Sequence, residues 1–252
     1  MTVLVCIPTY GVGRELVEKS VRSVLAQTHK DLACVVIGDG ETPPLPHIAD
    51  SRLVVLSYSR NRGPYFAQDV ALWASPHEWY APIASDDWVD PDHLERMLEL
   101  AQDVACGALY FHNDHYPDGI VIRKAYEVGL YRTRRYTEIG AHNPAERIGQ
   151  DSLTLKLMRL VAPVGATSHP TYHRLGRKGS LSTHPDTDRH SRQRIEMRQR
   201  NRAILAKCVG LRSADRIKAY RETLIPDEIK TELAEQVELL RSQLGAKKEE
   251  AA

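Results

Sequence analysis

In the amino-terminal part of the chain, short continuous apolar runs alternate with runs of helical spacing. The continuous runs are rich in β-branched residues, as in strands buried on both faces, and cover residues 3–7, 32–37, 53–58 and 79–84. Apolar positions three and four apart predict a helix over residues 14–27. Another helix is expected over residues 65–73, and Asp90-Pro91 marks the start of a third, since aspartate caps helices and proline suits their first turn. This order predicts an α/β fold with helices flanking a mostly parallel sheet.

Polar or glycine-rich segments follow the four predicted strands. They are Pro8-Thr9-Tyr10-Gly11, Gly38-Asp39-Gly40, Ser59-Arg60-Asn61-Arg62-Gly63 and Ser85-Asp86-Asp87. The carboxyl ends of parallel strands meet at one edge of a sheet, and ligands bind there in folds of this kind. The sequence therefore predicts one binding site that is built from these four segments.

The rest of the chain has a different character. Residues 108 to about 172 predict short strands and a helix over residues 151–160. From residue 188 the sequence is helical and highly charged, basic over residues 189–221 and mostly acidic after them. The acidic part contains an amphipathic stripe with steps of three and four residues, formed by Ile229, Leu233, Val237, Leu240 and Leu244. We expect a charged helical C-terminal extension over residues 188–252.

Composition narrows the class of protein. The chain of 252 residues is 42% hydrophobic and 27% charged, with a formal net charge of +1, which excludes a strongly basic nucleic-acid binder and an acidic disordered chain. Its four cysteines lie far apart, which favours reduced thiols over disulfides or a zinc site. No apolar run approaches the roughly 20 residues of a membrane-spanning helix, and the first residues read as a strand instead of a signal peptide. We expect a soluble, cytoplasmic protein without a transmembrane segment.

Two of the strand ends carry recognisable chemistry. The adjacent carboxylates of Asp86 and Asp87 repel each other, and a divalent cation such as Mg²⁺ or Mn²⁺ would relieve that repulsion. The alternative is that Asp87 or Asp90 only caps the next helix. Asp39, between two glycines, can accept hydrogen bonds from a base or a ribose, although Gly-Asp-Gly is also common in simple turns.

In their order and spacing, these segments resemble glycosyltransferase family 2, whose members have the GT-A fold. The matching segments are Cys6-Ile7-Pro8-Thr9-Tyr10, residues 20–28, residues 35–40, Asn61-Arg62-Gly63 and residues 83–88. They correspond to the opening strand, the helix after it, the second strand, the Asn-x-Gly before the third helix and the metal-binding strand end. The resemblance runs from residue 3 to about residue 182. It implies a catalytic domain over residues 1–187, with a nucleotide-binding half (1–107) and an acceptor half with a lid (108–187).

The resemblance also implies roles for single residues. Thr9 and Asp39 would contact the nucleoside of the donor. Asp86 would face the ribose or the metal, and Asp87 would ligate the Mn²⁺ or Mg²⁺ that bridges the donor diphosphate. The residues expected to bind the donor are Pro8, Thr9, Tyr10, Asp39, Gly40, Arg62, Gly63, Ser85, Asp86, Arg174 and Arg177.

The chain departs from the family pattern at three positions. Gly38 stands where the first of two aspartates is usual, and Ala84 stands where an acid is common. Gln68 replaces an arginine that is common in the family and that contacts the donor. Arg60 or Arg62 could take over that contact.

Inverting transfer requires a carboxylate that takes the proton from the acceptor hydroxyl. In the family this base is the aspartate of a Glu-Asp pair at the start of a helix, and Gln150-Asp151 stands at that place here. The resemblance therefore implies that Asp151 is the catalytic base, and capping of the helix is its alternative role. His142, in the preceding loop, is interpreted as solvated or as an acceptor contact.

A basic segment over residues 172–182 resembles the family segment that folds over the donor diphosphate. It contains Arg174 and Arg177 among glycines, a composition that suits a mobile lid that binds phosphate. An exposed basic loop is the alternative. Ligation of the metal by His173 or His184 is also open.

The charged C-terminal part permits several interpretations. We favour a solvated basic helix over residues 189–221 that packs on the catalytic domain. Contact with an anionic acceptor, either nucleic acid or a lipid-phosphate surface, is the alternative, and the scarcity of aromatic residues argues against base stacking. The stripe over residues 229–244 predicts a possible contact between copies of the chain in a homo-oligomer.

The predicted function is that of a metal-dependent inverting glycosyltransferase, which moves a sugar from a nucleotide-diphospho-sugar, preferably UDP-linked, to an acceptor hydroxyl. One alternative is a sugar-phosphate nucleotidylyltransferase. Gly11-Val12-Gly13-Arg14 resembles the glycine-rich Gly-x-Gly-x-Arg loop of such enzymes only weakly. The other alternative is a catalytically degenerate, transferase-like scaffold or binding protein whose function lies in its C-terminal helices.

Overall fold

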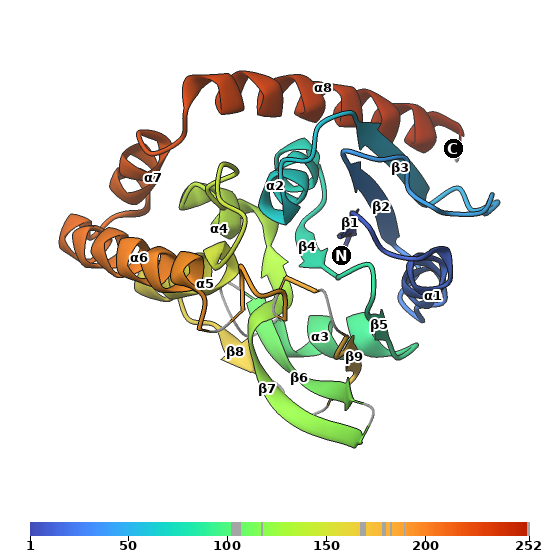
Figure 1. Ribbon diagram of the computed structural model, residues 1–252. Helices are drawn as coiled ribbons and strands as arrows, with labels where there is room; N and C mark the ends of the chain where they lie inside the picture. The colour runs from blue at the N-terminus through green and yellow to red at the C-terminus, as the bar shows by residue number, and fades with distance from the viewer. Residues whose placement is uncertain are drawn as a thin grey trace.

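A single sheet runs through the protein in the strand order β3-β2-β1-β4-β7-β6-β9-β5, with β8 paired to β6 (Figure 1). The computed structural model describes residues 1–101, 107–116, 118–166, 170–177, 180–181, 183–188 and 190–250. The strands are β1 (Val3–Thr9), β2 (Leu32–Asp39), β3 (Leu53–Tyr58), β4 (Trp79–Pro82), β5 (Trp88–Val89), β6 (Gly107–Tyr116), β7 (Gly119–Arg132), β8 (Gly165–Ala166) and β9 (Tyr172–Leu175). Five of the eight strand pairings are parallel, which confirms the mostly parallel sheet.

The strands β3, β2, β1 and β4 form the parallel half of the sheet, and their carboxyl ends lie at one edge. The register pairs Thr9 with Gly38, so the polar ends of β1 and β2 are neighbours. The strand predicted over residues 79–84 leaves the ladder at Pro82, and the Ile83 amide still donates to the Cys6 carbonyl at 2.9 Å. The segment with Asp86 and Asp87 is thereby held beside the end of β1.

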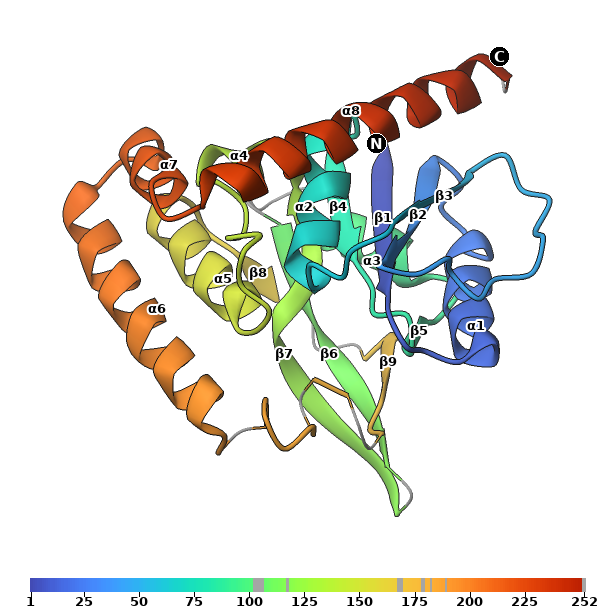
Figure 2. The same cartoon turned by 45° about the horizontal axis from the view of Figure 1, so that its top comes forward.

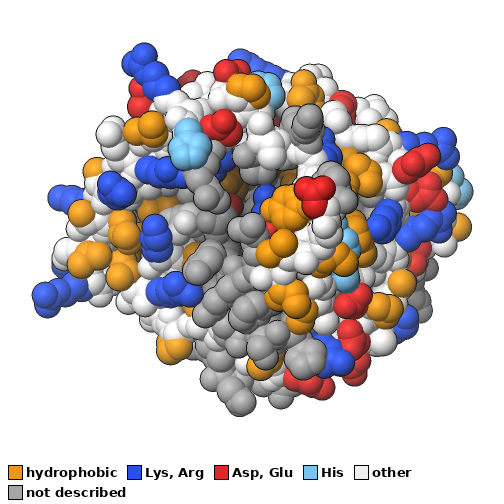
Figure 3. All heavy atoms as spheres, turned by 60° about the horizontal axis from the view of Figure 1, so that its bottom comes forward, with side chains coloured by type: hydrophobic (Ala, Val, Ile, Leu, Met, Phe, Trp, Pro, Cys, Tyr) orange, Lys and Arg blue, Asp and Glu red, His pale blue; other side chains and the backbone are white. Residues whose placement is uncertain are grey.

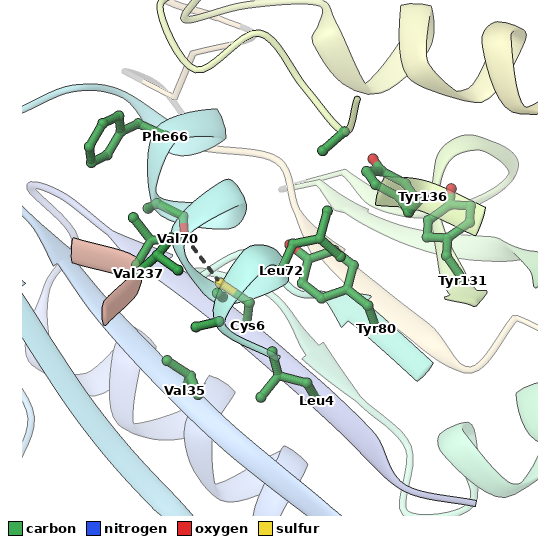
Figure 4. Close-up of a cluster of buried hydrophobic side chains, with 14 of the residues drawn as sticks. Leu4, Cys6, Val35, Phe66, Val70, Leu72, Tyr80, Tyr131, Tyr136 and Val237 are labelled. Carbon is green, nitrogen blue, oxygen red and sulfur yellow. Dashed lines mark hydrogen bonds between the residues drawn. The ribbon is translucent and has the colours of Figure 1, made fainter. Parts of the chain in front are cut away.

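Helices cover both faces of this half because successive residues of each strand point to opposite sides. The helices are α1 (Arg14–Leu25), α2 (Pro64–Ala74), α3 (His93–Ala101), α4 (Thr133–Glu138), α5 (Gln150–Val161), α6 (Arg192–Leu211), α7 (Ala214–Glu222) and α8 (Asp227–Glu250). Val3, Val5 and Ile7 belong to one buried cluster with α1 and α3. Leu4 and Cys6 belong to a second cluster with α2, in which the Cys6 thiol faces the carbonyl of Ala67 (Figure 4).

The C-terminal helices are part of this second cluster. Helix α8 crosses over α2 in both views (Figures 1 and 2), and Val237 lies beside Val70 (Figure 4). Four residues of the predicted stripe are at most 9% exposed, namely Ile229, Val237, Leu240 and Leu244. The stripe is thus covered within one chain, and α8 packs on the second buried cluster. A contact between copies through this stripe would require α8 to leave α2.

Helix α6 packs against α5, and a serine caps each of the first two C-terminal helices. The Ser191 side chain accepts from the Arg194 amide at the start of α6, and the Ser213 side chain accepts from the Arg216 amide at the start of α7. In the described part of the chain, no helix combines the length and the apolar character needed to cross a membrane.

Candidate active site

Asp39 holds the loop that leads into α2. Its Oδ1 accepts from the Arg62 amide and its Oδ2 from the Gly63 amide, each at 2.7 Å. Burial raises the pKa of this carboxyl above its usual range, and the two backbone hydrogen bonds oppose that shift. The side chain is 2% exposed, so Asp39 joins the end of β2 to the amino terminus of α2 and still borders the edge where the strands end.

Two buried side-chain oxygen atoms at this edge lack a hydrogen-bond partner among the described residues. The hydroxyl of Thr9, at the end of β1, makes no hydrogen bond with any described residue. The amide oxygen of Asn61 is in the same situation among the described residues, although its Nδ2 donates to the Asp39 carbonyl at 3.1 Å. A buried polar atom without a partner is costly, so these two oxygens favour a ligand with hydrogen-bond donors or a hydroxyl.

The glycines beside Asp39 are required by close contacts. A Cβ atom on Gly38 would lie 2.0 Å from the Glu41 carbonyl oxygen. Gly40 has φ +88°, and a Cβ there would lie 2.5 Å from the Asn61 nitrogen. The Glu41 carboxylate accepts from the Gly11 amide at 3.0 Å, which ties this turn to the loop after β1. The departure from the family pattern at Gly38 therefore follows from the tight turn that Gly38, Gly40 and Glu41 make.

Asp87 is a buried carboxylate with two protein donors. The Tyr172 hydroxyl donates to its Oδ2 at 2.6 Å, and the Leu175 amide donates to its Oδ1 at 2.9 Å. Burial, with a smaller contribution from the neighbouring charge of Asp86, raises the pKa of Asp87 to about 7. Tyr172 also accepts from the Ala84 amide at 3.3 Å, so β9 fixes the position of this carboxylate.

Asp86 is paired with the predicted lid. The Arg177 Nε donates to its Oδ2 at 2.6 Å, so the arginine expected to bind the donor diphosphate already lies at this strand end. The Arg174 guanidinium lies 3.5 Å from the buried carboxylate of Asp114 on β6, and its charge also lowers the pKa of Asp87 against the effect of burial. Lys178, Gly179 and Ser182 of the predicted lid lie outside the described residues.

Asp86 and Asp87 are the candidate ligands of the divalent cation that the sequence predicts. Among the described residues, no group of three or more histidine, cysteine or acidic side chains is arranged to hold a metal. Mg²⁺ and Mn²⁺, however, bind through one or two carboxylates and complete their shell with substrate phosphates and water. Each carboxylate oxygen keeps a lone pair beyond its hydrogen bond. The two side chains therefore fit a cation that arrives with a diphosphate.

The two histidines considered as metal ligands do not join this pair. His173 uses both ring nitrogens, with Nε2 2.9 Å from Asp90 Oδ1 and Nδ1 2.9 Å from His115 Nε2. Its ring is also stacked on Trp88. His184 is exposed and has Asp186 as its nearest acid, at 3.7 Å. In this structure neither ring contacts Asp86 or Asp87.

Asp151 lies in the first turn of α5 and lines a pocket between α5 and α6. The helix N-cap is Gly149, with φ +73°, two residues before Asp151, so Asp151 does not fill the capping role that was its alternative. One carboxylate oxygen of Asp151 accepts from the Ser152 amide at 2.8 Å, and Oδ2 is left for another partner. Gln150, which replaces the usual glutamate, is buried and its side-chain oxygen accepts from the Asn143 amide at 3.1 Å. A neutral amide suits that position because burying an unpaired charge is costly.

His142 is buried in a network that the sequence pattern did not reveal. Its Nδ1 lies 2.7 Å from Asp69 Oδ1 and its Nε2 lies 2.8 Å from the Tyr136 hydroxyl, and the ring is 1% exposed. The expectation of a solvated histidine is wrong. Arg221, buried on α7, donates to the Ile139 carbonyl at 2.9 Å in the same loop. Asp69, Tyr136 and Arg221 thus connect α2, α4 and α7 to the loop of residues 139–142.

The remaining predicted donor residues differ in their surroundings. The Arg62 guanidinium is directed to α8, where its Nε donates to Glu232 Oε1 at 2.9 Å. Gly63 is buried at the N-cap of α2 with φ +99°, and Ser85 is buried beside Asp86. Pro8 is partly buried and Tyr10 is 58% exposed, so both are open to a ligand.

Arg147 is a cation near Asp39 that belongs to none of the sequence motifs. Its guanidinium donates to the Asn61 carbonyl at 2.7 Å, and its charge lowers the pKa of Asp39 slightly against the effect of burial. It belongs to the loop before α5 and is therefore far from Asp39 in sequence. Only the packing of that loop on Gly63 brings it to the strand ends.

Comparison with known proteins decides the family. Residues 4–161 match the model of glycosyl transferase family 2. The chain belongs to glycosyltransferase family 2. The succinoglycan biosynthesis protein ExoO of Rhizobium meliloti is 35% identical over 98 residues, and glycosyltransferase GlyA of Streptococcus pneumoniae is 28% identical over 122 residues. These matches cover 37% and 44% of this chain and 28% and 17% of the relatives, so the chain spans only part of their length.

Solved structures confirm the predicted GT-A fold of this family member. TarS of S. aureus superposes with a TM-score of 0.57 at 17% identity, covering 70% of this chain and 37% of TarS. GalNAc-T7, in a structure with UDP, GalNAc and Mn²⁺, superposes with a TM-score of 0.61 at 11% identity, covering 81% of this chain and 48% of GalNAc-T7. A further TarS structure contains UDP-GlcNAc.

Proposed function

We propose that this family 2 member is an inverting glycosyltransferase that moves a sugar from a UDP-linked donor to an acceptor hydroxyl. The observation that carries the proposal is the buried hydroxyl of Thr9, which has no hydrogen-bond partner among the described residues. It lies at the edge where β1 and β2 end, next to the segment with Asp39. A nucleoside would offer this edge the hydroxyl and amide groups that such atoms need. The fold neighbours TarS and GalNAc-T7, whose structures contain UDP-GlcNAc and UDP, support a UDP-linked donor.

Asp86 and Asp87 would hold Mn²⁺ or Mg²⁺ together with the donor diphosphate. The cation supplies charge stabilisation for the departing diphosphate when it is bound. Tyr172 and Leu175 keep the Asp87 carboxylate in place for that contact. Arg177, which lies on Asp86, carries a permanent positive charge that can pair with the same diphosphate.

Asp151 would act as the general base. Its carboxylate takes the proton of the acceptor hydroxyl while that oxygen attacks the anomeric carbon on the face opposite the nucleotide. A bond between the acceptor oxygen and the anomeric carbon forms, the bond between that carbon and the diphosphate oxygen breaks, and UDP leaves with the electron pair. A single displacement of this kind inverts the configuration of the sugar.

Thermal melting with a panel of nucleotides tests this proposal. We expect UDP to raise the melting temperature in the presence of Mn²⁺ or Mg²⁺ and to do so less in EDTA, because a ligand that binds only the folded state stabilises it. A degenerate scaffold would respond to no nucleotide. A sugar-phosphate nucleotidylyltransferase would respond to a nucleoside triphosphate and would release pyrophosphate from it when given a sugar 1-phosphate.

A further inference from the structure

The pocket that contains Asp151 has an unusual charge. It measures about 270 Å³ and lies between α5 and α6. Its charged lining consists of Asp151 and Lys156 on α5 and of Arg194, Arg198 and Arg202 on α6. Since residues four apart lie on one face of a helix, the three arginines turn the same face of α6 to the pocket. One carboxylate thus faces four cations.

Three of these cations are free to bind a ligand. Arg194 is occupied, because its guanidinium donates to the Thr187 carbonyl at 2.7 Å and also to the Leu181 carbonyl. Lys156, Arg198 and Arg202 are exposed, and their side chains make no ion pair or hydrogen bond in the part of the chain that the structure describes. Asp151 is the one carboxylate among the described residues that line the pocket, so positive charge is in excess there and the pocket favours an anion.

Other arginines of α6 do not share this property. Arg192 pairs with Glu196 at 2.7 Å, and Arg200 pairs with Glu146 at 3.0 Å. Figure 3 shows several lysine and arginine side chains on the left of one face, the side on which α6 lies in Figure 1. Arg198 and Arg202 are thus the arginines of α6 whose side chains have neither an ion pair nor a hydrogen bond among the described residues, and both line the pocket.

We propose that this pocket binds a phosphate group of the acceptor and thereby holds the acceptor hydroxyl at Asp151. The inference rests on the proposed function, because it is Asp151 as base that makes this the acceptor side of the site. Guanidinium groups bind phosphate oxygens through paired hydrogen bonds, and the lysine adds a point charge. None of the residues predicted to bind the donor lines the pocket, so the donor diphosphate is not the anion expected there.

The shape and the lining favour a phosphate-bearing sugar or polyol over the two macromolecular partners. No aromatic side chain is among the residues found to line the pocket, so bases of a nucleic acid would find no stacking partner. A flat lipid surface would meet the exposed arginines of α6 without bringing a hydroxyl to Asp151 in the recess. A compact anionic acceptor satisfies both requirements.

Binding of a matched pair of probes to the chain of residues 1–252 tests this inference. The probes are a fluorescein-labelled maltotriose with a terminal phosphate and the same trisaccharide without phosphate, measured by anisotropy in the presence of saturating UDP. The pocket variant is R198Q/R202Q, and the control variant R192Q/R200Q removes the same charge from the same helix outside the pocket. UDP affinity and melting temperature are measured for each protein.

We expect the wild-type protein to bind the phosphorylated probe roughly tenfold or more tightly than the neutral one, because charge-assisted hydrogen bonds are strong. R198Q/R202Q should lose that preference, and R192Q/R200Q should keep it, with UDP affinity and melting temperature unchanged in both. Equal binding of the two probes, or an equal loss in both variants, would overturn the inference. So would binding to vesicles with 30% phosphatidylglycerol that depends on Arg198 and Arg202 while the probes show no preference. A protein that binds no UDP refutes the proposed function instead, and the two failures are thus separable.

Discussion

The hydroxyl of Tyr172 donates a 2.6 Å hydrogen bond to Oδ2 of Asp87, a residue 85 positions earlier in the chain. This contact makes the antiparallel pair of β5 and β9 part of the site, since β9 also supplies the Leu175 amide to the same carboxylate. It explains how a buried acid can keep a defined orientation without a neighbouring cation among its hydrogen-bond partners.

The pKa of Asp87, raised to about 7, predicts how donor binding depends on pH. Below that pH the carboxyl group is protonated and is a poor ligand, and above it the carboxylate is charged and can hold a cation. Cation-dependent UDP binding should therefore strengthen as the pH rises through about 7. In Tyr172→Phe the midpoint should move to higher pH, because the carboxylate loses a donor. Calorimetric titration with UDP and Mn²⁺ over this range measures the midpoint.

Asp87→Asn should abolish the increase in cation-dependent UDP binding as the pH rises through about 7. The same increase in that variant would exclude Asp87 as a ligand of the cation.

The unpartnered hydroxyl of Thr9 predicts a separation of stability from binding. Thr9→Val removes the hydroxyl and keeps the shape, so the melting temperature should stay the same or rise. UDP affinity should fall roughly five- to tenfold if the hydroxyl bonds the nucleoside. Thr133→Val is the matched control, because its hydroxyl is also buried without a partner among the described residues and lies on α4. Equal UDP affinity in wild type and both variants would remove Thr9 from the donor site.

The ion pair of Arg62 with Glu232 predicts that Arg62 stabilises the fold more than it binds the donor. A double-mutant cycle with Arg62→Gln and Glu232→Gln should give a coupling free energy of about 0.5–1 kcal/mol in denaturant unfolding, since the pair is partly exposed. UDP affinity should change less than about twofold in either single variant. A tenfold loss of UDP affinity in Arg62→Gln but not in Glu232→Gln would contradict this prediction. It would mean that Arg62 leaves Glu232 on α8 and contacts the donor.

The buried side chains of α8 predict that the catalytic fold depends on this helix. Removing all residues after Pro226 removes Ile229, Val237, Leu240 and Leu244 from the second buried cluster and exposes the surfaces that they cover. At about 1.5–3 kcal/mol for each buried side chain, the loss is comparable with the whole stability of a domain. The truncated chain should not melt cooperatively, whereas a chain that ends at Ala246 should. A cooperative transition after truncation at Pro226 would show that residues 1–226 fold alone.

The short apolar runs predicted the parallel half of the sheet because a buried strand leaves a local signal at consecutive positions. Glycines and acids at the strand ends indicated Asp39, Asp86 and Asp87 as candidate site residues, because they too leave a signal at consecutive positions. The partners of these residues were not predictable, because Tyr172 and Arg147 reach them only through packing of distant segments. The apolar stripe of α8 was visible, but the pattern of one helix does not tell whether the covering surface belongs to the same chain.

The most direct test of the account is UDP release from a panel of UDP-sugars mixed with a carbohydrate extract, comparing wild type with Asp151→Asn. Asp215→Asn is the control, because Asp215 holds the corresponding second position of α7. Asp151→Asn should lower the rate of acceptor-dependent UDP release roughly a hundredfold, with UDP affinity and melting temperature unchanged, whereas Asp215→Asn should keep the wild-type rate. A near-normal rate in Asp151→Asn would contradict the account and remove Asp151 from the mechanism.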